Sequence, residues 1–125
     1  MGKSDPTGQA MTWAWGTTVD GSGNVYTTGC FENTVDFDPG SGTANRTSNG
    51  NSDIFVHKMD GDGNFMWARR MGEDDDNQGF DYGLGVAVDA SGDVYTTGKY
   101  SGSIDIDPGA GTSTLPYGGG IFVQK

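Results

Sequence analysis

Cysteine, histidine and basic residues are scarce in this sequence, and each shortage excludes a class of structure or function. The single cysteine, Cys30, has no partner for an internal disulfide. The single histidine, His57, has no second histidine beside it and no nucleophile motif with which to build a catalytic triad. With 7 Lys and Arg against 17 Asp and Glu, the net charge is -10, which repels phosphate backbones and anionic membrane surfaces. We therefore expect no enzymatic activity, no nucleic-acid partner and no membrane partner.

Long apolar runs are also lacking. No run approaches the roughly 20 residues of a membrane-spanning helix, and the first ten residues, MGKSDPTGQA, lack the apolar stretch of a secretory signal. Hydrophobic residues make up 33% of the chain, whereas glycine alone fills 23 of its 125 positions. Each interior glycine costs a helix about 1 kcal/mol relative to alanine, so this composition favours short strands joined by tight turns. The sequence predicts an all-β protein.

One segment of the sequence occurs twice. GTTVDGSGNVYTTG at residues 16–29 returns as GVAVDASGDVYTTG at residues 85–98, an offset of 69. Over the 28 aligned positions 16–43, 16 residues are identical. Farther on, IFVHK at 54–58 matches IFVQK at 121–125 with an offset of 67. A period of this length indicates a repeat architecture, with a first unit over residues 1–70 and a shorter second unit over 71–125.

Within the units, three similar turn sequences occur: DGSGN at 20–24, DGDGN at 60–64 and DASGD at 89–93. Glycine permits a positive φ angle, and Asp or Asn side chains bond to the local backbone, which is the chemistry of hairpin turns. The first unit is therefore predicted to pair residues 16–20 with 24–31 and residues 53–59 with 64–70. The loop 32–52 between these hairpins is expected to hold a brief extended piece at 34–37.

The sequence predicts that the strands are buried on both faces of their sheets. Ile54-Phe55-Val56 and Phe65-Met66-Trp67 are continuously apolar instead of alternating. Four-stranded antiparallel sheets stacked face to face on identical sheets are the blades of a propeller. A β-sandwich is the competing fold, but it predicts polar outer faces and gives no reason for the repeat. The second blade lacks its last strand, the partner of residues 121–125 and the equivalent of 63–70.

The segments GVAVDASGDVYTTG, VDFDPG, DIFVHKMD and GNFMWARRMG resemble the seven-bladed β-propeller repeat family. The resemblance extends over nearly the whole chain and implies a propeller fold. Because such repeats are common in large, exported bacterial proteins, it also implies an extracellular or cell-surface location. It implies no specific activity, because the family is defined by its blades.

Two blades are too few for a ring, because propellers close with about 4–8 blades. An open pair is expected to leave two apolar faces in water. Head-to-tail contacts between copies would close a six-bladed ring as a trimer or an eight-bladed ring as a tetramer. A homo-oligomer is therefore the predicted state. Other packings, including a strand-swapped dimer, and an excised fragment of a longer protein remain alternatives.

Two groups of residues are candidate binding sites. Asp36 with Asp38, and Asp105 with Asp107, stand two residues apart, so on an extended strand each pair would offer carboxylates to one Ca²⁺. Turn capping is the alternative role. Trp13 and Trp15 would form a sugar-stacking platform if a loop exposed them, whereas a place in the core or between blades is the simpler interpretation of these tryptophans and of Trp67.

Two functional classes follow. The first is a non-enzymatic scaffold whose ring presents loops to another protein or to a matrix. The second is a carbohydrate- or calcium-dependent binding module with one site in each blade. An enzyme is disfavoured, because two similar blades repeated by symmetry offer little chemical diversity.

Overall fold

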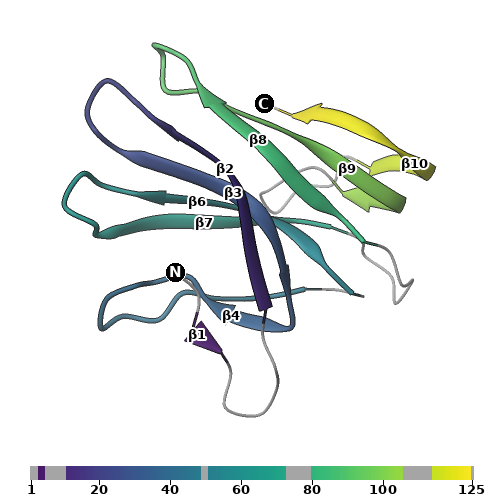
Figure 1. Ribbon diagram of the computed structural model, residues 1–125, viewed down its shortest axis with the longest axis horizontal. Helices are drawn as coiled ribbons and strands as arrows, with labels where there is room; N and C mark the ends of the chain where they lie inside the picture. The colour runs from purple at the N-terminus through teal and green to yellow at the C-terminus, as the bar shows by residue number, and fades with distance from the viewer. Residues whose placement is uncertain (1–2, 5–10, 49–50, 73–79, 106–113, 125) are drawn as a thin grey trace.

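Over the residues described by the computed structural model, which are 3–4, 11–48, 51–72, 80–105 and 114–124, the chain forms antiparallel β-sheets and no helix. For residues 3–4, 102–105 and 114–124 the backbone alone is described. Figure 1 shows the arrangement of the strands. In chain order these are β1 (Lys3–Ser4), β2 (Met11–Val19), β3 (Val25–Glu32), β4 (Thr34–Asp36), β5 (Asn45–Thr47), β6 (Asp53–Met59), β7 (Phe65–Met71), β8 (Tyr82–Val88), β9 (Val94–Asp105) and β10 (Thr114–Gln124).

Three sheets are formed by these strands. The first unit supplies a four-stranded sheet in the order β2-β3-β6-β7 and a small sheet in the order β1-β4-β5. The second unit supplies a three-stranded sheet in the order β10-β9-β8. The four-stranded sheet pairs its strands in chain order, as a propeller blade does, and is compatible with that architecture. The all-β prediction is confirmed.

The three repeated turns, at 20–24, 60–64 and 89–93, have the predicted geometry. Gly23, Gly63 and Gly92 have φ angles of 85°, 85° and 83°, which a residue with a side chain rarely adopts. In the first turn, one Asp20 carboxylate oxygen accepts the backbone N–H groups of Ser22 and Asn24, both at 2.9 Å. The turns thereby fix the register of the hairpins β2-β3, β6-β7 and β8-β9.

Two predicted details of the first unit were wrong. The first strand begins at Met11 instead of residue 16, because residues 11–14 continue the pairing with β3 beyond a register shift between Ala14 and Gly16. The loop 32–52 contains a second short strand, β5, which pairs with β4 to form a hairpin. Arg46 on β5 fastens this hairpin to the sheet, since its guanidinium donates to the Ala68 carbonyl oxygen from Nε at 3.1 Å and from Nη2 at 2.9 Å.

The two middle strands of the four-stranded sheet, β3 and β6, are buried on both faces, as the apolar run Ile54-Phe55-Val56 predicted. The same prediction was wrong for the run Phe65-Met66-Trp67 of β7, because Met66 is 48% exposed. On one face, the β4-β5 hairpin covers a group that we call the hairpin-side cluster. On the other, the sheet of the second unit covers the sheet-side cluster (Figure 1). Phe55 belongs to the first cluster, whereas its neighbours Ile54 and Val56 belong to the second. The hairpin-side cluster consists of Phe31, Val35, Phe37, Phe55 and Ala68; the sheet-side cluster consists of Ile54, Val56 and Met71, with Trp67, Val86, Val94 and Tyr100 packed against them.

The expectation that both outer faces of a two-unit chain lie open is therefore wrong for part of the first sheet. The β4-β5 hairpin buries Phe31 and Phe55 completely, and Phe37 of the same loop is also fully buried. The reason is the length of the loop between β3 and β6, which lets it fold back over its own sheet.

The two units contact each other through glycines. A β-carbon added to Gly16 on β2 would lie 3.1 Å from the Gly85 α-carbon on β8. A β-carbon added to Gly83 would overlap the Thr28 hydroxyl and lie 3.0 Å from the Gly29 carbonyl oxygen. Strand β8 thus approaches β2 and β3 nearly backbone to backbone.

We expect Gly83→Ala to lower the free energy of unfolding by about 1–3 kcal/mol, because the new methyl group forces the two sheets apart. Urea denaturation followed by tryptophan fluorescence measures the change. Ala87→Gly on the same strand is the control, because Ala87 is exposed. Its replacement should cost only the roughly 0.5–1 kcal/mol that a flexible glycine costs in a strand. Equal losses in the two variants would contradict the close approach.

Candidate functional site

The predicted calcium ligands Asp36 and Asp38 lie at the end of β4 and act as acceptors for the backbone. Asp36 Oδ1 accepts the N–H groups of Asp38 at 3.0 Å and Ala44 at 2.9 Å. Asp38 Oδ1 accepts the N–H of Gly40 at 2.7 Å. The two carboxylates therefore hold the loop between β4 and β5 in place.

No group of three or more His, Cys, Asp or Glu side chains is placed to hold a metal ion within the described ranges. In the second unit, Asp105 ends β9, where its backbone pairs with Thr114, and Asp107 lies outside the described residues. The geometry of the first pair agrees with the turn-capping alternative. Calcium binding by Asp36, Asp38, Asp105 and Asp107 stays a prediction.

Trp13 and Trp15 lie in strand β2, not in a loop, yet both are exposed, with 39% and 50% of their surfaces accessible. Trp15 contacts Tyr82 of the second unit edge to face, with ring centroids 5.4 Å apart. Tyr82 in turn lies parallel to Phe80 at 6.3 Å, and Phe80 is 46% exposed. Trp15, Tyr82 and Phe80 form an aromatic row across the seam between the units.

The sequence pattern missed Tyr82 and Phe80, although the repeat held a signal for Tyr82. Trp13 and Tyr82 occupy equivalent positions of the repeat, as do Trp15 and Leu84, and both members of the second pair are exposed. Trp67 agrees with the simpler interpretation, a place in the core or between the units, because it packs against the sheet-side cluster.

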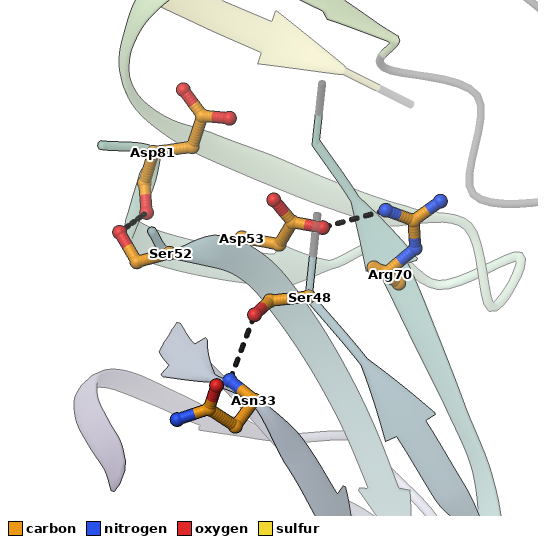
Figure 2. A network of polar contacts seen from close by, with 6 residues as sticks. All are labelled: Asn33, Ser48, Ser52, Asp53, Arg70 and Asp81. Carbon is orange, nitrogen blue, oxygen red and sulfur yellow. Dashed lines mark hydrogen bonds and ion pairs between the residues drawn. The ribbon is translucent and has the colours of Figure 1, made fainter. Parts of the chain in front are cut away.

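A polar network joins the end of the first sheet to the start of the second (Figure 2). The Asp53 carboxylate is fully buried and binds Arg70 Nη1 on β7 at 2.6 Å, and it lies against Gly72, where a β-carbon would overlap it. The Ser52 hydroxyl donates to the Asp81 carbonyl oxygen at 3.4 Å, and the Asp81 N–H donates to the Ser52 carbonyl oxygen at 3.1 Å. Together these contacts fix where the second unit begins relative to β6.

The Asp-Gly turn at 60–64 resembles a calcium loop in sequence but is a hydrogen-bonded turn. Asp60 Oδ1 accepts the N–H groups of Asp62 and Asn64, both at 2.9 Å, and Asp60 Oδ2 accepts the Asn64 side-chain amide at 3.0 Å. These hydrogen bonds stabilise the ionised form and lower the pKa of Asp60. The same bonds recur at Asp20, where the Asn24 side chain and further donors lower the carboxyl pKa to about 2.

His57 is fully buried in β6, against the β4-β5 hairpin. Its Nε2 donates to the Phe37 carbonyl oxygen at 2.9 Å, and its ring lies between those of Phe37 and Phe65. Its Nδ1 has no hydrogen-bond partner within the part of the chain that the structure describes. Burial lowers the pKa of this imidazole, because the charged form would lose its hydration. His57 thus holds the hairpin onto the sheet in its neutral form.

The chain has no match among protein-family models, curated proteins or solved structures. Among the described residues, no helix is long and apolar enough to span a membrane.

We expect the free energy of unfolding to fall as the pH is lowered from 7.5 to 5.5. The pKa of His57 is depressed in the folded state, so in this window the unfolded chain binds more protons and stability rises with pH. Urea denaturation at several pH values measures the slope. His57→Gln, which installs the residue found at the equivalent position 124, should flatten it; an unchanged slope in this variant would contradict the assignment.

We expect Asp36→Ala to cost about 1–3 kcal/mol in calcium-free buffer, because two backbone N–H groups lose their acceptor. Thermal melts of the wild type and the variant, with and without millimolar calcium, measure the effect. If the wild type is stabilised only by added calcium, and the variant is not, then these carboxylates serve a metal ion instead of the loop.

Proposed function

We propose that this chain is a non-enzymatic β-propeller repeat module that self-associates head to tail and acts as a structural or protein-interaction scaffold. The observation that carries the proposal is the packing of the second unit on the first. Two copies of one repeat are stacked inside the chain through different faces, and this kind of contact can continue from copy to copy.

The two units are built alike at the contact. The register shift between Ala14 and Gly16 in β2 recurs between Gly83 and Gly85 in β8, at the offset of 69. The pair Thr17 with Thr27 likewise recurs as Val86 with Thr96. The face of β8 that contacts the first sheet is thus equivalent to one face of β2.

That equivalent face of β2 is uncovered in the isolated chain. Ala14, Thr17 and Val19, which we call the open strip, are all exposed, and Val19 is 58% accessible. Their counterparts Gly83, Val86 and Val88 are buried or half-buried. The open strip shares its face with the hairpin-side cluster but lies beyond the cover of the β4-β5 hairpin.

A second copy is the natural occupant of the open strip, because the chain already holds the complementary surface. In the first unit, that surface is the face of the sheet carrying Thr28, Ile54 and Val56, which receives β8. The second unit has the equivalent strands in β9 and β10. Three copies joined in this way would complete six blades and four would complete eight, within the range of about 4–8 blades found in propellers.

One residue makes the contact between copies weaker than the contact within the chain. Ala14 stands where the second unit has Gly83, and a β-carbon at Gly83 would overlap the Thr28 hydroxyl. Packing of the open strip on a second copy therefore requires a small shift of one sheet. A reversible association follows, and the fraction of associated chains depends on protein concentration.

We expect the wild type to sediment as an oligomer that dissociates on dilution, and Val19→Lys to sediment as a monomer, because the new charge lies in the proposed contact. Met66→Lys on β7 is the matched control, since Met66 is similarly exposed, at 48%, but lies away from the open strip. Sedimentation velocity over a range of concentrations measures the mass. A wild type that is monomeric throughout, or equal effects of the two variants, would overturn the proposal.

The aromatic row favours a second function, carbohydrate binding. Trp15 and Phe80 expose ring surface on either side of Tyr82, and apolar ring faces with polar neighbours are suited to sugar rings. No charge on the ligand is needed, in keeping with the acidity of the chain.

Titration with neutral oligosaccharides such as cellohexaose and xylohexaose, followed by tryptophan fluorescence, tests this second function. Trp15→Leu, which installs the residue found at the equivalent position 84, should abolish a saturable change while the fold is retained. A wild type whose fluorescence does not respond would remove this candidate.

A further inference from the structure

One face of the repeat is covered in two different ways in this chain. In the second unit, Val94 and Tyr100 pack against the sheet-side cluster of the first sheet. Their equivalents at the offset of 69 are Val25 and Phe31, which lie on the face of the first sheet that carries the hairpin-side cluster. We call this the hairpin-side face. The β4-β5 hairpin of the first unit thus covers the face that a neighbouring sheet covers in the second.

The segment that forms this cover takes two backbone paths in the two units. Strand β9 runs without interruption over Val94–Asp105 and pairs with β10 both before and beyond Gly102. At the position equivalent to Gly102, the first unit has Asn33, where the chain bends between β3 and β4 with a φ angle of 60°. Beyond this bend, β4 pairs with β5 instead of β6. The repeat therefore supports a straight path and a path that folds back over the sheet.

The hairpin is closed at its base by a single pair of residues. The Asn33 N–H donates to Ser48 Oγ at 2.8 Å (Figure 2), and the Ser48 N–H donates to the Asn33 carbonyl oxygen at 3.1 Å. Among residues with a side chain, Asn is one of the few that tolerate a positive φ angle. Residues at the ends of strands that absorb a change in φ and ψ are the usual hinges of moving segments.

Beyond this base, few contacts hold the hairpin on the sheet. Arg46 donates two hydrogen bonds to the Ala68 carbonyl oxygen on β7, and His57 Nε2 on β6 donates to the Phe37 carbonyl oxygen. Val35 and Phe37 supply the apolar side chains of the hairpin segment. Breaking these contacts leaves the pairing of β3 with β6 intact. Segments held by few contacts are the ones that open locally while the remaining structure stays folded.

We propose that the β4-β5 hairpin is a hinged cover that opens about Asn33 and Ser48, and that the uncovered hairpin-side face then docks on the second unit of another copy. The proposal rests on the proposed self-association and adds its regulation. With the hairpin closed, only the open strip is available for docking; with the hairpin open, the whole face is. A second copy is the occupant, because the equivalent face, with Val94 and Tyr100, already packs on a sheet of the same repeat inside the chain.

The chain carries one chemical reporter on each face of the first sheet. His57, its only histidine, is fully buried under the hairpin. Cys30, its only cysteine, is also fully buried but pairs with Ile54, so its side chain lies on the face of the sheet-side cluster. Opening of the hairpin exposes His57 alone, whereas unfolding exposes both residues.

The first experiment measures acylation of His57 by diethylpyrocarbonate and alkylation of Cys30 by N-ethylmaleimide, on the full chain at high dilution. Each rate is divided by its value in the urea-unfolded chain. We expect His57 to be protected at least about tenfold less than Cys30, because it becomes accessible by local opening. Arg46→Ala should speed the labelling of His57 about tenfold and leave that of Cys30 unchanged, because only the hairpin loses hydrogen bonds.

The second experiment compares the dissociation constants of the variants by sedimentation velocity. If only the open form docks through the whole face, Arg46→Ala should lower the constant by up to about tenfold, in step with the labelling of His57. Arg69→Ala is the matched control, because it removes the same charge from an exposed position whose guanidinium contacts Trp67. Asn33→Val, which disfavours the positive φ angle, should act like Arg46→Ala, whereas Asn33→Gly should not.

The possible failures are distinguishable. Equal protection of His57 and Cys30 would overturn the hinged cover but not the self-association, because the open strip docks while the hairpin is closed. Faster labelling of His57 in Arg46→Ala without tighter association would overturn the docking of the uncovered face. A wild type and an Arg46→Ala variant that both stay monomeric at every concentration would overturn the proposed function and this docking together.

Discussion

The close approach of β8 to β2 and β3 is the contact on which the remaining structure depends. It is possible only because Gly16 and Gly83 carry no side chains where the two sheets meet. With the backbones this near, Val86 and Val94 reach the cluster around Ile54 and Val56, and the inner face of the first sheet is excluded from water. The same contact brings Tyr82 beside Trp15 and sets Asp81 against Ser52. Both the aromatic row and the polar network are therefore consequences of how the two sheets are stacked.

The strands of the first unit and their turns could be predicted because their signals are local. The Asp-Gly turns fix three hairpins through bonds within five residues, and the continuously apolar run at 54–56 indicated burial on both faces. The β4-β5 hairpin could not be predicted in the same way. Its position depends on distant contacts, namely Arg46 with the Ala68 carbonyl and Phe37 with Phe31 and Phe55. A loop that folds back onto its own sheet leaves little periodic signal in the sequence.

The candidate sites likewise combine features that the sequence reveals with features that depend on distant contacts in the fold. The spacing of Asp36 and Asp38 was visible in the sequence, but their use as acceptors for Asp38, Gly40 and Ala44 N–H groups depends on the path of the loop. Trp13 and Trp15 stood out by residue type, whereas the contact of Trp15 with Tyr82 on β8 required knowledge of how the units stack. Two observations support the proposed self-association: the contact between the units inside the chain, and the open strip on β2, which is equivalent to the face of β8 that this contact covers. They are the reason why we propose that the chain is an assembly module.

Nuclear Overhauser contacts between the two sheets measure directly whether the units meet at these glycines. Stacking through these glycines predicts cross-peaks between the α-protons of Gly16 and Gly85, and between the Gly83 α-protons and the Ile54 γ2-methyl group, in a uniformly labelled sample. Their presence would establish that the repeats stack through glycine as described. A spectrum that shows the hairpins β2-β3 and β8-β9 intact but no contacts between these glycines would contradict the account, because the two units would then fold without packing on each other.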